Sequence, residues 1–256
     1  MYTLIGDVLN VVGQIQVMAM IFLSVRVVDN KKPFYVVLTT IIANFHVSHF
    51  QNILSMIKYK LTSQNLQSFG GFQWEMGVKK TTNGKGDLCG PGWLHCYSNP
   101  LLATLLNPIH TNIQDPKLFE VEVGGENKND YGLKEGWTEM TLIKEISFPD
   151  ITPVQKIAFA ILCSLEIYKE EKYVEWANNW LNNIDRVSEY VFSDNPLHAA
   201  YHANQAVKVF NRDIDCVFGM SPLCYIHVSN AAFFYAYSDN ADLIFMAEKA
   251  WGSTWI

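Results

Sequence analysis

Apolar and polar residues alternate along the middle of the chain, and this pattern predicts a pair of β-strands. Residues 117–123 place three apolar side chains on one face of an extended segment and two glutamates on the other. Such alternation is typical of a half-buried strand. Residues 137–148 form a second long stretch of the same kind, which Pro149 closes. We expect the two stretches to pair as antiparallel neighbours.

The apolar spacing changes to that of α-helices after Asp150. Thr152-Pro153 followed by Gln155 is a helix start, because Thr is a good N-cap, Pro fits the first helical position and Gln can complete a capping box. Small residues recur through the segments that follow, so we expect helices that pack closely. Further helices are predicted at 173–181, 195–209, from 221 onward, and at 238–251.

These patterns together predict an α+β fold. Residues 58–150 are expected to form a mainly β domain with an antiparallel sheet at about 69–148. Residues 151–256 are expected to form a helical region, rich in small residues at about 152–251, that packs on the sheet.

Residues 1–57 differ from the rest of the chain because they carry few charges. Val8–Val25 and Phe34–Ile57 contain no charged residue at all. Either stretch approaches the length of a membrane span, but polar residues dilute both. A membrane hairpin, buried core elements and an upstream extension all remain open for this segment.

The composition narrows the class of protein. The chain has 256 residues, of which 49% are hydrophobic, and a net charge of −6. A large core can therefore be buried, and general nucleic-acid binding, which needs a basic surface, is not expected. The five cysteines are odd in number and irregularly spaced, which indicates reduced thiols. We expect a cytoplasmic protein, with membrane association through residues 1–57 left open.

The densest cluster of reactive side chains lies in the sequence GKGDLCGPGWLHCY at residues 84–97. A glycine loop there precedes a short strand, and the loop's backbone N–H groups could approach a phosphate or carboxylate. Alternation along the strand would place three ring side chains on one face. The candidate ligand-binding residues are Gly90, Gly92, Trp93, His95, Tyr97, Asn107 and His110. The alternative is that these side chains belong to the core and the glycines only turn the chain.

A short helix is expected after this strand. Asn99-Pro100 is a good helix start, and the helix at 101–106 is expected to stop before Pro108. Such a helix could fold His110 back toward the strand. Cys96 is a poor nucleophile partner for His95, because neighbours in a strand point to opposite faces.

The sequence contains no complete catalytic or metal-binding motif, and no cofactor can be named. There is no phosphate-binding P-loop, and the glycine spacing of a dinucleotide site is incomplete. His198 and His202 lie four residues apart on a predicted helix, which makes them weak metal candidates. Nothing in the sequence places a third ligand such as Cys216, Cys224 or His227 beside them.

From about residue 61 to 256 the chain resembles a family of uncharacterised proteins found mainly in bacteriophages, prophages and metagenomic sequence. Residues 1–57 lie outside the resemblance, which implies no established activity. The motifs that carry it are SFGGFQW at 68–74, LC at 88–89, GWLHCY at 92–97 and LLATLLNPIH at 101–110.

A second, looser resemblance is to folds of the ADP-ribosyltransferase type, in which a strand histidine holds the nicotinamide ribose. His95 would take that place here, although no catalytic glutamate can be aligned. We therefore expect a phage-type accessory protein that binds a small ligand or a host protein without catalysis. The alternatives are an enzyme that uses NAD, centred on His95, and a protein anchored to a membrane by residues 1–57.

Overall fold

The computed structural model describes residues 57–193, 196–212 and 221–253. The chain divides into two compact units, Met1–Met56 and Ile57–Ile256, and every described residue belongs to the second. The three alternatives for the apolar N-terminal segment, and the possible ligand Cys216, therefore lie outside the described residues.

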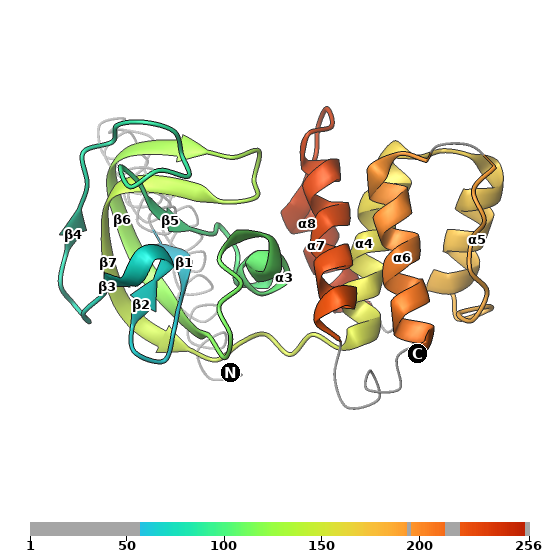
Figure 1. Cartoon of the computed structure of the whole chain (residues 1–256), viewed down its shortest axis with the longest axis horizontal. Helices are drawn as coiled ribbons and strands as arrows, with labels where there is room; N and C mark the ends of the chain where they lie inside the picture. Colours follow the sequence, from blue (N-terminus) through green and yellow to red (C-terminus); the bar gives the residue numbers. More distant parts are fainter. Residues whose placement is uncertain (1–56, 194–195, 213–220, 254–256) are drawn as a thin grey trace, which may run out of the picture. The chain divides into compact units, whose positions relative to one another are not determined.

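The second unit has an α+β fold, as the sequence predicts, and its main sheet is antiparallel (Figure 1). The predicted pair of long strands is present as β6 and β7, which form the centre of the sheet. The strand order is β1-β6-β7-β4, with β5 also paired to β7. The five strands are β1 (Ile57–Thr62), β4 (Lys80–Thr81), β5 (Leu94–Cys96), β6 (Lys117–Asn129) and β7 (Glu135–Ile146).

The strands curl into a nearly closed barrel. Tyr97, directly after β5, exchanges two backbone hydrogen bonds with Tyr59 of β1, with N–O distances of 2.7 and 2.9 Å. The ring β1-β6-β7-β5 therefore returns to β1, which leaves few unpaired strand edges. A separate core fills its concave face: Trp74, Leu94, Cys96, Phe119, Val121, Val123, Met140 and Leu142.

The sheet begins earlier than the predicted residue 69, because β1 already pairs with β6 from Ile57 onward. A small hairpin follows β1, made of β2 (Gln67–Ser68), a 3₁₀ turn (Phe69–Gly71) and β3 (Phe72–Gln73). After β3 the chain forms no regular strand up to residue 78. Gly77 adopts a positive φ of 73° there, which bends the backbone out of a strand.

The prediction that the helix after β5 stops before Pro108 is wrong, because helix α3 spans Pro100–His110. Proline removes one backbone N–H from a helix and leaves the carbonyl four residues earlier without its usual donor. That carbonyl belongs to Thr104, and it accepts a hydrogen bond from the Tyr225 hydroxyl instead. Ser229 Oγ donates similarly to the neighbouring Leu105 carbonyl, at 2.6 Å. The helix continues past Pro108 because a hydroxyl of α7 supplies the one donor that the proline lacks.

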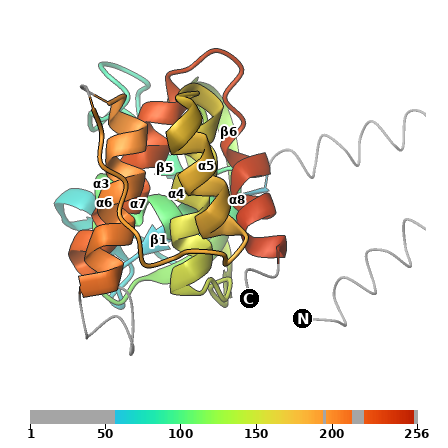
Figure 2. The ribbon, with the colours of Figure 1, turned by 90° about the vertical axis from the view of Figure 1, so that its right-hand side faces the viewer.

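The remaining helices form a layer in which α4 contacts α6, α7 and α8 (Figure 2). The predicted capping box is present at the start of α4, between Thr152 and Gln155. α6 begins three residues later than predicted, and α8 five residues later because Asp242 caps it. These helices are α4 (Pro153–Ile167), α5 (Glu171–Leu181), α6 (His198–Arg212), α7 (Pro222–Ala236) and α8 (Leu243–Gly252).

Helix α3 joins the sheet to this layer, since it contacts β1 on one side and α7 and α8 on the other. Buried alanines, including Ala203 of α6 and Ala232 of α7, let the helices approach closely. Within the described ranges, no helix is both long and apolar enough to cross a lipid bilayer.

Candidate functional site

The structure brings three of the sequence-predicted residues together on one side of β5: His95, Tyr97 and His110. Tyr97 packs into the core shared with the helices, while Leu94 and Cys96 point into the barrel core. The Tyr97 hydroxyl lies 2.9 Å from His110 Nδ1, and the two ring centroids are 5.6 Å apart. Helix α3 thus carries His110 back to the strand, as the sequence suggests.

His95 fastens the glycine loop to the strand. Its Nε2 lies 2.5 Å from the carbonyl oxygen of Leu88 and donates to it. Burial lowers the pKa of His95, and the nearby Lys60 and Lys134 lower it further. At neutral pH the imidazole is therefore uncharged, and its one N–H is used inside the chain.

His110 is uncharged for the same reason and to a greater degree. Burial lowers its pKa to about 3, with smaller contributions from Lys134 and His95. Burial also raises the pKa of Tyr97. The hydroxyl and the imidazole nitrogen share a hydrogen bond, and both groups stay neutral. A base this weak is poorly matched to proton transfer at neutral pH.

The two predicted glycines shape the loop. A Cβ on Gly92 would lie 2.1 Å from the Lys85 carbonyl oxygen, so only glycine fits there. The Gly90 N–H donates to the Asp87 carbonyl at 2.8 Å, and the Gly92 carbonyl accepts from Gly84 at 3.0 Å. The loop therefore closes on itself, and the Gly90 N–H is not available for an anion.

Trp93 and Asn107 also have partners within the chain. Trp93 is buried, donates from Nε1 to the Gly86 carbonyl at 3.2 Å and packs under the Lys128 ammonium at 4.8 Å. The Asn107 side chain exchanges two 3.0 Å hydrogen bonds with the backbone of Ile113 and so holds the turn after α3. Both residues support the site without facing solvent.

A group of side chains lies around this buried set, and we call it the rim cluster: Cys89, Asp130, Tyr131, Lys134 and Tyr237. Cys89 and the two tyrosines are exposed, whereas the side chains of Lys134 and Asp130 are only 13% and 22% exposed. Lys134 Nζ lies 3.2 Å from Cys89 Sγ and 4.0 Å from an Asp130 carboxylate oxygen. The Tyr131 and Tyr237 rings are 4.7 Å apart. The cluster thus combines residues of the glycine loop, the β6–β7 turn and the end of α7.

Tyr131 stands out within the rim cluster. Its φ is 49°, in the left-handed region that bulky residues rarely adopt, and its side chain is 64% exposed. Strained backbone and exposed aromatic rings both gather at binding sites. Sequence reasoning missed this cluster because its members are far apart in the chain, and only the turn-forming Gly132 beside Tyr131 hinted at it.

Charged side chains inside the barrel were also missed. Lys58 Nζ pairs with Glu135 Oε1 at 2.9 Å, and the other oxygen of this buried carboxylate accepts from Trp137 Nε1 at 2.8 Å. The alternation of Lys58 and Lys60 with apolar residues is typical of a strand whose lysines face water. Here both faces of β1 are covered, so the pattern alone misplaces them.

Lys60 is fully desolvated. Its ammonium donates to the His95 carbonyl at 2.7 Å and lies 4.6 Å from the Trp74 ring centroid. Burial lowers its pKa to about 8. Cys96 on the same inner face is completely buried, and burial raises its pKa strongly. Cys96 is therefore an inert core thiol and not a nucleophile.

The predicted histidine pair of α6 does not converge on a metal. His202 Nδ1 lies 2.9 Å from His227 Nδ1 on α7, so one imidazole donates to the other, while His198 packs against Phe234 at 4.6 Å. Burial lowers the pKa of His202 to about 4. The part of the chain that is described holds no group of three potential ligands arranged for a metal ion.

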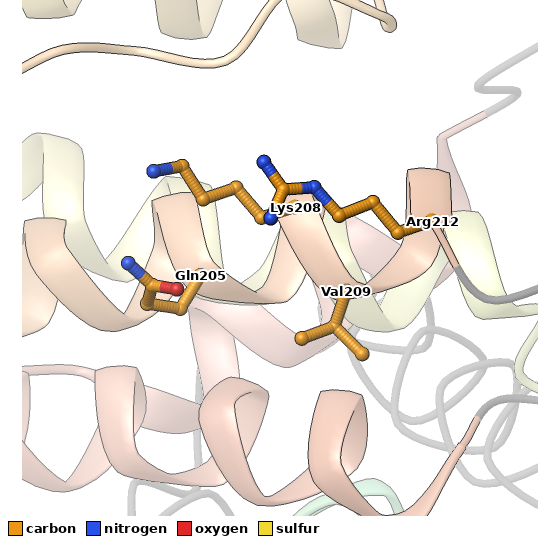
Figure 3. Close-up of a pocket in the computed structure, with 4 residues that line it drawn as sticks. All are labelled: Gln205, Lys208, Val209 and Arg212. Atoms are coloured by element: carbon orange, nitrogen blue, oxygen red, sulfur yellow. The ribbon is translucent and has the colours of Figure 1, made fainter.

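A shallow, open depression of about 300 Å³ lies on α6, where Gln205, Lys208, Val209 and Arg212 line it (Figure 3). Lys208 and Arg212 extend along the helix and share the carboxylate of Glu189, at 3.5 and 2.8 Å. One carboxylate against two cations leaves this surface positive. No sequence motif predicts this depression, and only the spacing of the four residues places them on one stretch of α6.

Comparison with known proteins finds a similarity for the β-rich part of the chain. No curated protein and no solved structure matches the sequence. Residues 56–153, which include every strand and α3, are similar to a domain of unknown function, DUF7666.

Proposed function

We propose that the second unit is a binding module that holds a small ligand at the rim cluster without catalysing a reaction on it. One observation carries this proposal. Two separate segments, the β6–β7 turn and the end of α7, place a strained, exposed tyrosine, a second exposed tyrosine and a partly buried lysine next to one another. Neither the packing of the barrel nor that of the helices requires Tyr131 to be there.

The chemistry of the rim cluster favours a flat ring that carries a negative charge. Tyr131 and Tyr237, 64% and 52% exposed, offer ring faces for stacking. Lys134, whose side chain is 13% exposed, offers an ammonium that donates to Cys89 Sγ at 3.2 Å and lies 4.0 Å from the Asp130 carboxylate, too far for a strong hydrogen bond. Nucleotides combine both features, so NAD, ADP-ribose and cyclic nucleotides are the first ligands to test.

The buried histidines support binding over catalysis. Both imidazoles have lowered pKa values and both are hydrogen-bonded inside the chain. The alternative, an ADP-ribosyltransferase-like enzyme, needs His95 for the nicotinamide ribose, but His95 Nε2 already donates to Leu88. In our proposal the histidines brace the loop that carries Cys89.

The sequence resemblance to phage and prophage proteins indicates where this module would act. We propose an accessory role in the cytoplasm of a host cell, in which the ligand or a host protein carrying it is recognised. The match at 56–153 names no activity and is compatible with this role.

A thermal-shift screen of the full chain tests the proposal. The ligands are NAD, ADP-ribose, cyclic nucleotides and divalent metals. A ligand at a hundred times its dissociation constant adds about 2.7 kcal/mol of stability, a shift of several degrees. We expect a nucleotide to raise the melting temperature, and Tyr131→Ala and Lys134→Met to abolish the shift.

Tyr201→Ala is the matched control, because Tyr201 is an exposed tyrosine on α6 outside the rim cluster. It should leave the shift unchanged. A shift that persists in Tyr131→Ala and disappears in His95→Ala at unchanged stability would overturn the proposal in favour of a site at His95.

A further inference from the structure

A segment between α5 and α6 presents apolar side chains to solvent. Ile184, Val187 and Val191 are 71%, 80% and 83% exposed. They all lie within residues 182–192, which we call the 182–192 segment. Single exposed apolar residues are ordinary, but three within eight positions form a local apolar surface.

The segment is firmly held to the two helices that flank it. Trp176 of α5 donates from Nε1 to the Ser188 carbonyl at 2.8 Å. Asn204 of α6 exchanges hydrogen bonds of 3.1 and 2.7 Å with the backbone of Tyr190. Asn204 is buried, so this contact anchors the segment to the interior of the helical layer.

Further contacts fix the charged residues of the segment. Glu189 pairs with Lys208 and Arg212, whose side chains run along α6 (Figure 3). Asn211 donates to the Arg186 carbonyl at 2.9 Å. A preformed backbone lowers the entropy lost on binding, so the fixed conformation makes this apolar surface a good docking site.

Arg186 shows what kind of partner fits. Its Nε donates to the Trp180 carbonyl at 3.1 Å, and its guanidinium lies 5.0 Å from the Trp180 ring centroid. Across the described ranges it pairs with no carboxylate. Arg186 Nη2 and the indole Nε1 of the buried Trp180 both lack a hydrogen-bond acceptor there. The Trp180 indole is fully buried and out of reach of a partner, whereas Arg186 is only partly buried and is a cation without a carboxylate in the described part of the chain, so Arg186 favours an anionic group.

We propose that the 182–192 segment binds an acidic, aliphatic peptide segment of a partner protein. A carboxylate of that peptide pairs with Arg186 once the guanidinium turns outward, which costs the bond from Nε to the Trp180 carbonyl and the contact with the Trp180 ring. Aliphatic side chains on either side of the carboxylate pack on Ile184, Val187 and Val191. The other acid of the segment, Asp185, accepts from the Val187 and Ser188 N–H groups, so it does not compete for Arg186.

A peptide array probed with the full chain tests this inference. Each peptide carries one central Asp or Glu flanked by Val, Ile or Leu, and its twin carries Asn or Gln instead. We expect acidic peptides to bind at least tenfold more tightly than their amide twins. The difference should shrink at high salt, because screening weakens charge pairing.

Variants of the chain locate the binding surface. Val187→Ser with Val191→Ser should weaken binding at least fivefold with little change in melting temperature, since both side chains are exposed. Arg186→Lys keeps the charge but not the planar fork and should remove most of the preference for acid over amide. Val78→Ser, an exposed valine beside the barrel, is the matched control and should bind like wild type.

Three outcomes would overturn the inference. The first is an array without any signal that depends on Arg186. The second is equal binding of acidic and amide peptides. The third is self-association of the chain that is lost in the Val187→Ser, Val191→Ser variant, which would assign the surface to a second copy. Nucleotide binding at the rim cluster is measured separately, so failure of one proposal leaves the other intact.

Discussion

The Tyr225 hydroxyl donates a hydrogen bond to the Thr104 carbonyl, the acceptor that Pro108 leaves without a helical partner. A proline that ordinarily ends a helix thereby becomes part of the joint between α3 and α7. Ser229 repeats the contact at the next carbonyl. The hydrogen bond from Tyr225 joins α3 to α7 at the carbonyl that Pro108 leaves free.

This relationship predicts an interaction between two substitutions. Tyr225→Phe leaves the Thr104 carbonyl unsatisfied and should cost about 1–3 kcal/mol of unfolding free energy. In a Pro108→Ala background the restored backbone N–H can reach the same carbonyl, so Tyr225→Phe should cost clearly less. Urea unfolding of the four proteins measures the coupling. Equal costs in both backgrounds would contradict this account, and Tyr201→Phe serves as the neutral control.

Lys60 should make stability depend on alkaline pH. Its pKa falls from about 10.4 when unfolded to about 8 in the barrel, so between these values the unfolded chain binds more protons. This lysine therefore destabilises the fold below pH 8, and the penalty is relieved as the pH rises toward 10.

Lys60→Met removes that penalty and keeps the aliphatic length. We expect the variant to gain roughly 1–3 kcal/mol over wild type at pH 7, and to lose most of that advantage at pH 9.5. Denaturant unfolding at the two pH values checks it. An advantage that is the same at both would mean that Lys60 does not titrate in this range.

His110 should make the protein sensitive to acid. Its pKa in the fold is about 3 and about 6.5 when unfolded, so the unfolded chain binds the extra proton between these values. Stability is therefore lost as the pH falls below 6.5. His110→Gln should flatten this part of the stability profile, although it is less stable at pH 7 because the contact with Tyr97 changes. His198 is an exposed histidine at the start of α6, and His198→Gln is the comparison variant in unfolding measurements across this pH range.

Two glycines of one loop should differ sharply in their tolerance of a methyl group. Gly92→Ala would press a Cβ against the Lys85 carbonyl oxygen at 2.1 Å, so the loop must move, and we expect a loss above about 2 kcal/mol. Gly86→Ala has open space around it, so only its positive φ should lower the free energy of unfolding, by about 1 kcal/mol. Comparable melting temperatures for the two variants would mean that the loop adapts freely.

Local signals in the sequence predicted the parts of the fold that local physics decides. The alternation at 117–123 identified the buried face of β6, and the Thr152–Gln155 capping box and the Asn99 cap are present as expected. Each of these signals involves residues a few positions apart. Alternation and capping act over that range, so one sequence is enough to read them.

Contacts between distant residues decided the rest. Pro108 stays within a helix only because α7 supplies a hydroxyl more than a hundred positions away. Lys60 is buried because β5 returns to β1, and no pattern within β1 indicates this burial. The rim cluster needs the β6–β7 turn and α7 side by side. The ring residues of β5 were found, but their partners, and hence their structural role, came from the fold.

The closure of the barrel has a consequence for how the chain is made. β1 leaves the ribosome well before its partner strand β6, and at about 5–20 residues per second it waits seconds for that partner. During this time an apolar strand with free edges risks pairing with other chains. Lys58 and Lys60 give the waiting strand two positive charges, which keep it soluble. The charge of Lys60, which destabilises the finished barrel, thus helps to protect its first strand during synthesis.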